Sequence, residues 1–134
     1  VGMKYTEYNM LNLANFIRAV GGKIAVFTGS DAMTYACLEG GGSGAVISIS
    51  NIAPRTSSSI YDLVVAGRLR DALRAQQALM PVVEAAGVGY FPAGLKEAMK
   101  AAGFPVGDVR GPQTRLSEGE KRRVRTLIQT AGLK

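Results

Sequence analysis

Short apolar runs alternate with segments of helical periodicity over the first fifty positions. The apolar runs are VGM at 1–3, KIAVFT at 23–28 and GAVISIS at 44–50. Between the first two runs, apolar residues recur at the i, i+3, i+4, i+7 spacing of an amphipathic helix. That series is Met10, Leu13, Ala14 and Ile17. Near-continuously apolar strands separated by helices are typical of a parallel sheet buried on both faces, so the pattern predicts the order β-α-β-α-β-α.

Turn and cap residues mark the ends of these helices. The first helix is predicted to stop at Gly21, where a glycine can adopt a left-handed conformation. Ser30 or Asp31 is expected to cap a short helix that reaches about Glu39. Pro54 suits the first turn of the helix after the third strand, because that position needs no N–H donor.

The remainder of the chain is predicted to be helix and loop. Two helices are expected at 55–66 and 68–86, and a third in FPAGLKEAMKAAG. Ser117 and Glu120 have the spacing of a capping box, which predicts the start of a last helix.

A three-stranded parallel sheet has two unpaired edges, and its apolar strands need other elements packed on both faces. Either other chains complete it, or the chain is the later part of a larger α/β fold. A (β/α)8 TIM barrel entered at its sixth strand fits the second interpretation. We therefore expect the last three βα units of such a barrel, strands 6–8, in residues 1–66. Residues 67–134 are expected to form a C-terminal helical extension.

Composition narrows the possible chemistry of this 134-residue chain. A single cysteine, Cys37, and the absence of histidine argue against a disulfide and against a transition-metal site. No stretch approaches the ~20 apolar residues of a membrane span. The net charge of +6 includes a basic cluster of Lys121, Arg122, Arg123 and Arg125. An apolar stripe at helical spacing runs through this segment, so we expect a solvated helix face and no nucleic-acid partner.

Candidate site residues lie where the predicted strands end, because barrel enzymes build their sites at the carboxyl edge of the sheet. These are Lys4, Gly29 with Ser30-Asp31, and the segment 46–51. The glycine run GGGSG at 40–44 precedes a strand, so we interpret it as a helix-to-strand connection and not as a phosphate site. Gly29 is either a simple turn or a place where a ligand approaches the backbone.

Lys4 admits two interpretations on pattern alone. A lysine at the end of an apolar strand can extend its ammonium group to solvent. It can also be a desolvated amine with a depressed pKa that attacks a carbonyl and forms a Schiff base. Both interpretations remain open at this point.

Three ordered segments resemble the dihydrodipicolinate synthase / N-acetylneuraminate lyase family of pyruvate-dependent class I aldolases. They are VGMKYT, FTGSDA and GGSGAVISISNIAPR, and the resemblance continues through LVVAGRLRDALRAQQALMPVVEA. It implies a (β/α)8 barrel with a C-terminal helical extension, of which this chain is the C-terminal half. It also implies a cytoplasmic homo-oligomer, a tetramer in the family, with no membrane partner.

The resemblance assigns roles to four residues. Gly2-Met3-Lys4 matches the family's Gly-hydrophobic-Lys motif, so Lys4 is expected to form a covalent imine with pyruvate or another 2-oxo acid. Gly29 and Val46 fall on positions beside the bound keto acid, and Thr6 is expected to contact substrate as well. No cofactor beyond the lysine imine is implied. The family's tyrosine and its carboxylate-binding residues belong to the first five strands, outside this sequence.

The resemblance implies a lyase that makes or breaks a carbon–carbon or carbon–oxygen bond, with an aldehyde as second partner, and that is active only with the N-terminal half. Two departures bear on the substrate: GYFPAGL stands before Lys96 where many synthases have Asn-Pro-Ile-Pro, and Tyr5-Thr6 follows Lys4 where they often have an acidic residue and alanine. An aldolase or dehydratase acting on a sugar-derived keto acid is therefore at least as well supported as a lysine-pathway synthase. The alternative is a non-catalytic barrel fragment or partner-binding homologue that has lost the chemistry.

Overall fold

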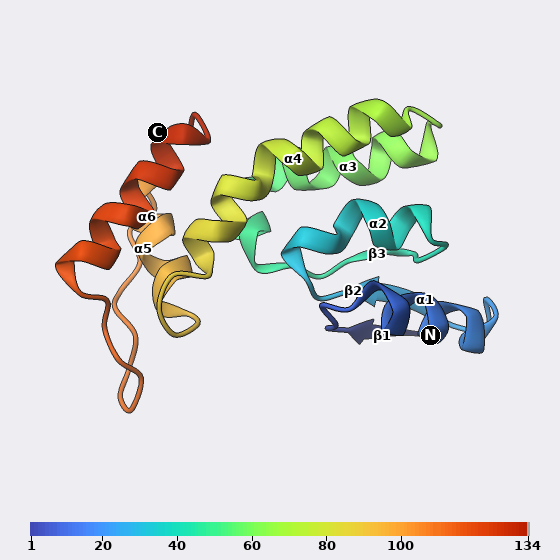
Figure 1. Cartoon of the computed structure of the whole chain (residues 1–134), viewed down its shortest axis with the longest axis horizontal. Helices are drawn as coiled ribbons and strands as arrows, with labels where there is room; N and C mark the ends of the chain where they lie inside the picture. Colours follow the sequence, from blue (N-terminus) through green and yellow to red (C-terminus); the bar gives the residue numbers. More distant parts are fainter. Residues whose placement is uncertain (134) are drawn as a thin grey trace. The chain divides into compact units, whose positions relative to one another are not determined.

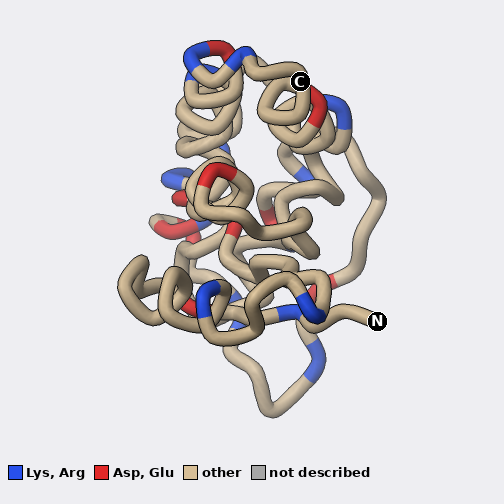
Figure 2. Tube along the Cα trace, turned by 90° about the vertical axis from the view of Figure 1, so that its right-hand side faces the viewer, with Lys and Arg blue, Asp and Glu red and all other residues tan. Residues whose placement is uncertain are grey.

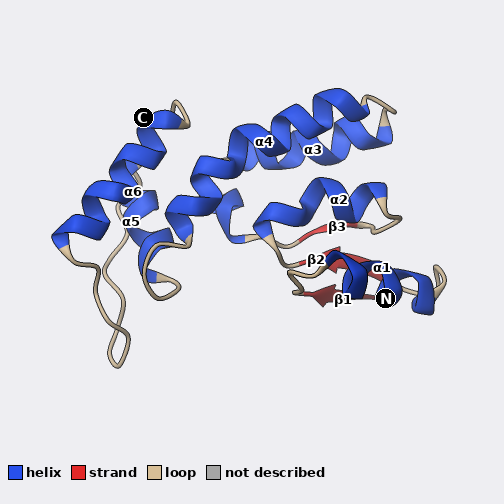
Figure 3. Cartoon of the chain, viewed as in Figure 1, coloured by secondary structure: helices blue, strands red, loops and turns tan. Residues whose placement is uncertain are grey.

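The computed structural model describes residues 1–133 (Figure 1). Its strands are β1 (Gly2–Tyr5), β2 (Ala25–Thr28) and β3 (Gly44–Ala45). Its α-helices are α1 (Met10–Val20), α2 (Thr34–Glu39), α3 (Pro54–Val65), α4 (Leu69–Ala86), α5 (Ala93–Ala101) and α6 (Glu118–Thr130). Two short 3-10 helices, η1 (Asp31–Met33) and η2 (Ser48–Asn51), follow β2 and β3. Helices dominate after residue 54, as the periodicity predicts (Figure 3).

The three strands form one parallel sheet in the order β1-β2-β3. In the register, Lys4 lies opposite Phe27 and Tyr5 opposite Thr28. Phe27 in turn lies opposite Gly44. Consecutive parallel strands joined by helices confirm the predicted βα order.

The third strand is shorter than the sequence predicts. An apolar run at 44–50 favours a long strand, but β3 ends at Ala45 and η2 begins at Ser48. The Ser48 hydroxyl donates a hydrogen bond to an Asp31 carboxylate oxygen at 2.7 Å. β3 pairs with Phe27 and Thr28, the last two residues of β2, so the ladder between these strands ends there.

Side-chain capping of the helix after β2 is also predicted wrongly. Ser30 occupies the N-cap position of η1 but makes no side-chain capping hydrogen bond. The Asp31 carboxylate accepts from Ser48 instead. The predicted end of the helix is correct, since α2 stops at Glu39.

The chain divides into two compact units, residues 1–48 with 55–77, and residues 49–54 with 78–134. The core of the first unit contains Leu13, Val26, Met33 and Cys37, with Tyr5, Phe16, Ile17 and Val20 packed against it. Helices α1 and α2 therefore cover one face of the sheet. The boundary between a barrel part and an extension at 66/67 stays a prediction.

Helix α1 is defined by caps at both ends. The Asn9 side chain accepts from the backbone N–H groups of Leu11 at 2.9 Å and Asn12 at 3.3 Å. Gly21 ends the helix in the left-handed conformation, with φ of 54°. The glycine end is predicted by the sequence, whereas the asparagine cap is not.

We expect Asn9→Ala to lower the free energy of unfolding by about 1 kcal/mol, because the first-turn N–H groups lose their acceptor. Urea denaturation followed by circular dichroism measures the change. Asn9→Asp keeps the acceptor and is the matched control. Equal stability of Asn9→Ala and the native chain would contradict this account of the cap.

The second unit is built around α5 and α6. Ser117 and Glu120 form the predicted capping box, with hydrogen bonds in both directions at the start of α6. Val124 and Ile128 on α6 and Ala98 on α5 are almost fully buried. Over residues 1–133, every helix is too short or too polar to cross a membrane.

Candidate functional site

Lys4, Gly29 and Val46 lie at the same edge of the sheet, where the three strands end. The Gly29 N–H donates to the Tyr5 carbonyl at 3.1 Å, and the Val46 N–H donates to the Thr28 carbonyl at 2.9 Å. Both bonds continue the ladder one step beyond the strands. The sequence prediction that these residues share the carboxyl edge is confirmed.

These residues also share one face of the sheet. Side chains alternate between faces along a strand, and register partners of neighbouring strands point the same way. Tyr5 stacks on Phe16 of α1 with ring centroids 4.4 Å apart, so Tyr5 points to the helix-covered face. Lys4 precedes Tyr5 and is in register with Phe27, so both point to the opposite face.

Gly29 is in close contact with the Lys4 side chain. A Cβ atom added at Gly29 would lie 2.6 Å from Lys4 Cε and 2.9 Å from Thr6 Cβ, and closer still to the Thr6 hydroxyl. Atoms of real side chains do not approach so closely. Position 29 therefore accepts only glycine without a shift of Lys4 or Thr6, because these two side chains lie against its backbone.

Three of the four predicted site residues are exposed. These are Lys4, Thr6 and Val46, the last at 52%, whereas Gly29 is half-buried. These three strands therefore do not supply the burial that a desolvated amine requires. Burial of the Lys4 amine would require further residues to pack on the exposed face beside it.

The Phe27 side chain lies on the same face of the sheet as Lys4. The sequence analysis does not identify it as a site residue. A Cβ added at Gly44 would lie 3.0 Å from the Phe27 ring, and one added at Gly2 would lie 3.1 Å from it. Glycines on both neighbouring strands thus make room for one aromatic side chain. The two glycines are visible in the sequence. Once the three strands are taken as parallel and consecutive, Gly2 and Gly44 lie on the strands to either side of Phe27.

The segment after Gly29 is fixed by two side chains from distant parts of the first unit. The Gln76 side-chain amide of α4 donates to the Asp31 carbonyl at 3.1 Å and accepts from the Tyr35 N–H at 3.1 Å. Gln76 is only 5% exposed. Ser48 holds the Asp31 carboxylate from the other side. Asp31 thus links the segments that follow β2 and β3. The sequence analysis predicted a helix cap for this residue.

We expect Gln76→Ala to lower the free energy of unfolding by about 1–3 kcal/mol, because a buried side chain that bridges two backbone groups is lost. The matched control is Gln77→Ala at the exposed neighbouring position. Chemical denaturation of both variants measures the difference. Equal stability of the two variants would show that the bridge does not anchor the segment.

The loop after β1 is organised by Glu7. Its carboxylate accepts from the N–H groups of Tyr8 and Asn9 and from the Asn12 side-chain amide. These hydrogen bonds lower the pKa of Glu7, led by the bond from Asn9. Glu7 therefore acts on the entry to α1, while Tyr8 is exposed.

Cys37 and the acidic residues do not form a metal site in the part of the chain that is described. No group of three or more His, Cys, Asp or Glu side chains is close enough to hold a metal ion within residues 1–133. Cys37 is fully buried, and burial raises the pKa of its thiol, with a smaller opposing effect from the Thr28 backbone. Its side chain belongs to the core.

Acidic positions are interspersed with basic ones along the chain (Figure 2). In the basic cluster at 121–125, Lys121 pairs with Glu118 at 2.7 Å and Arg125 pairs with Glu97 at 3.0 Å. The cluster is therefore partly neutralised, in keeping with a solvated helix face.

Comparison with known proteins gives a consistent result. The model of the dihydrodipicolinate synthetase family matches residues 1–131. The 4-hydroxy-tetrahydrodipicolinate synthase of Methanococcus maripaludis (strain C5) is 33% identical over 110 residues, which are 82% of this chain and 38% of that protein. The protein of the same name from Acidovorax sp. (strain JS42) is 33% identical over 133 residues, or 99% of this chain and 45% of that protein.

Two solved structures share the fold of this chain over its whole length. YagE, a prophage protein of the dihydrodipicolinic acid synthase family from E. coli K12 in complex with pyruvate, superimposes with a TM-score of 0.91 at 28% identity. That match covers 100% of this chain and 47% of YagE. The lysine-bound synthase from Cyanidioschyzon merolae gives a TM-score of 0.90 at 29% identity, over 100% of this chain and 45% of that one. The chain spans less than half the length of these relatives.

Proposed function

Because this chain belongs to the dihydrodipicolinate synthetase family, we propose that it carries the Schiff-base lysine of a class I lyase acting on pyruvate or another 2-oxo acid. The observation that carries the proposal is the contact between Lys4 and Gly29 at the carboxyl edge of a parallel sheet. Lys4 provides the nucleophile, and the absence of a side chain at Gly29 lets Lys4 lie against the backbone there, at the carboxyl edge.

The proposed reaction starts with attack of the neutral Lys4 amine on the keto carbon. The carbinolamine that forms loses water and becomes an iminium ion. The electron pair of a C–H or C–C bond at the carbon next to the iminium carbon then moves toward the cationic nitrogen, so that an enamine forms as a proton or an aldehyde leaves. This carbon attacks an aldehyde in the synthetic direction, and the iminium is finally hydrolysed to release product and restore Lys4.

The other predicted site residues have positioning roles in this proposal. Gly29 places its backbone beside the bound keto acid, and Thr6 presents a hydroxyl next to both Lys4 and Gly29. Val46 keeps its N–H in the ladder with Thr28, so its carbonyl is the group we assign to substrate.

We further propose that the active protein contains the rest of a (β/α)8 barrel. The strands of such barrels are buried on both faces, whereas Gly2, Met3 and Lys4 of β1 are all exposed. Additional strands beside β1 would bury them and remove water from around Lys4. They would also supply the proton-transfer residue that the reaction needs. A homo-oligomer is part of this proposal, although one solved relative at 25% identity is described as a monomeric synthase variant.

An assay of protein that contains the complete barrel tests the proposal. Pyruvate and other 2-oxo acids are offered together with a panel of aldehydes, sugar-derived ones included, and consumption of both substrates is followed. We expect turnover with at least one pair. Absence of turnover with every pair, together with absence of imine formation with any 2-oxo acid, would favour the non-catalytic alternative.

A further inference from the structure

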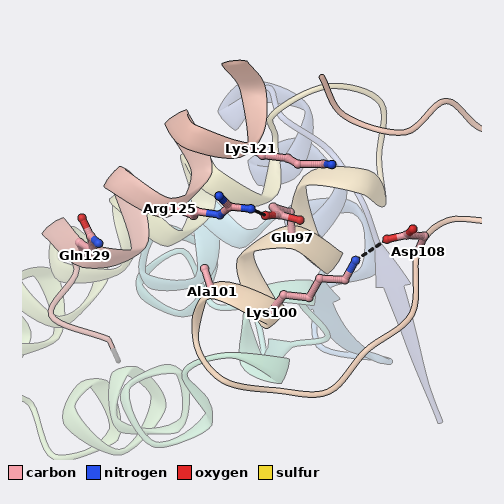
Figure 4. A pocket seen from close by; sticks show the side chains of 7 residues that line it. All are labelled: Glu97, Lys100, Ala101, Asp108, Lys121, Arg125 and Gln129. Carbon is pink, nitrogen blue, oxygen red and sulfur yellow. Dashed lines mark hydrogen bonds and ion pairs between the residues drawn. The ribbon is translucent and has the colours of Figure 1, made fainter. Parts of the chain in front are cut away.

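A charged cavity lies between α5, α6 and the loop that joins them, entirely within the second unit (Figure 4). Its volume is about 580 Å³, which falls in the range of small-molecule sites, roughly 300–1,000 Å³. The lining side chains are Glu97, Lys100, Ala101, Asp108, Lys121, Arg125 and Gln129.

Positive charge exceeds negative charge in this lining. Lys100, Lys121 and Arg125 line the cavity with the two carboxylates of Glu97 and Asp108, and Lys121 also pairs with Glu118 outside the lining at 2.7 Å. An adjoining pocket of about 70 Å³ shares four of these residues and adds two more cations, Lys96 and Arg115. The Lys100 ammonium holds the pKa of Asp108 below its usual range, and Glu118 raises the pKa of Lys121, so these groups are charged at neutral pH.

The ion pairs fix the cations without exhausting their donors. The Arg125 Nη2 atom donates to Glu97 Oε1 at 3.0 Å, and Lys100 pairs with Asp108 (Figure 4). A guanidinium group carries five N–H donors and an ammonium group three, so each cation has more donors than one carboxylate oxygen accepts. Glu97 is 7% exposed, so the Arg125 head group is held in place by a buried partner.

We propose that this cavity binds a small oxyanion, of the size of phosphate or a short dicarboxylate, between Lys100, Lys121 and Arg125. Several oxygens on one ligand match the several N–H donors that α5 and α6 contribute to this one cavity, and bidentate pairing with a guanidinium group is the strongest form of such contacts. Glu97 and Asp108 orient the cations, and Gln129 adds an amide donor at the end of the cavity on α6. The cavity residues belong to the second unit and Lys4 to the first, and the proposal requires none of the imine chemistry proposed above.

Titration of the full chain with inorganic phosphate and with succinate, followed by calorimetry at constant ionic strength set with chloride, tests the proposal. We expect saturable one-site binding of at least one of the two anions. Arg125→Gln and Lys100→Gln should each weaken that binding at least about tenfold. Arg123→Gln removes the same charge from an exposed position of α6 outside the cavity lining and should leave the affinity unchanged.

Two results would overturn the proposal. One is the absence of saturable binding of both phosphate and succinate by the native chain. The other is equal weakening by Arg123→Gln and Lys100→Gln, which would show a response to overall charge alone. If Arg125→Gln fails to fold because Glu97 loses its partner, Lys100→Gln decides the question, since the Lys100 side chain is 34% exposed and its loss leaves Glu97 paired.

Discussion

Arginine in place of Lys4 should lower turnover of 2-oxo acid at least about 1,000-fold, because the variant loses the only step that activates the keto group. The guanidinium group keeps the positive charge but stays protonated and cannot attack a carbonyl. Turnover is measured on protein that contains the complete barrel, with pyruvate or whichever 2-oxo acid gives the highest native rate. Loss of rate in this variant assigns the chemistry to the amine and not to its charge.

Lys23→Arg provides the matched control. Lys23 is exposed and lies before β2, at the edge of the sheet opposite to Lys4. We expect its replacement to leave turnover unchanged. Native turnover in Lys4→Arg, or an equal loss in both variants, would contradict the role proposed for Lys4.

Alanine in place of Gly29 should lower turnover about 100-fold, the cost of displacing a reacting group by about 1 Å. The added Cβ would lie 2.6 Å from Lys4 Cε and 2.9 Å from Thr6 Cβ, so the lysine side chain has to move. The chain should still fold, because Gly29 lies outside the helix-facing core. Turnover and thermal unfolding are measured on the same preparation.

Gly107→Ala is the control for this substitution. A Cβ at Gly107 would meet no atom of the described residues within 4 Å, so no side chain is displaced. We expect native turnover from this variant. A Gly29→Ala variant with native turnover would show that the contact with Lys4 does not position the amine.

Local pattern was sufficient to predict most elements of the fold. Apolar runs separated by helical periodicity gave parallel strands in consecutive order, and Gly21 and the Ser117–Glu120 pair gave helix boundaries. The length of β3 was not predictable from the pattern, because an apolar run does not show that its partner strand β2 ends at Thr28.

The candidate site was predictable in part for the same reason. The carboxyl edge and the alternation of side chains place Lys4, Gly29 and Val46 together once the strands are parallel. Phe27 and Gln76 were missed because their roles depend on contacts across strands and with α4. The cavity in the second unit was missed likewise, since Arg125 reaches Glu97 from 28 positions along the chain.

Borohydride reduction in the presence of pyruvate, followed by mass spectrometry of the digested protein, determines whether Lys4 forms the imine. The experiment uses protein with the complete barrel and traps the imine as a stable secondary amine. We expect one pyruvate-derived adduct, on the peptide that contains Lys4. An adduct confined to another lysine such as Lys23 or Lys96, or no adduct under conditions that trap a class I aldolase, would contradict it.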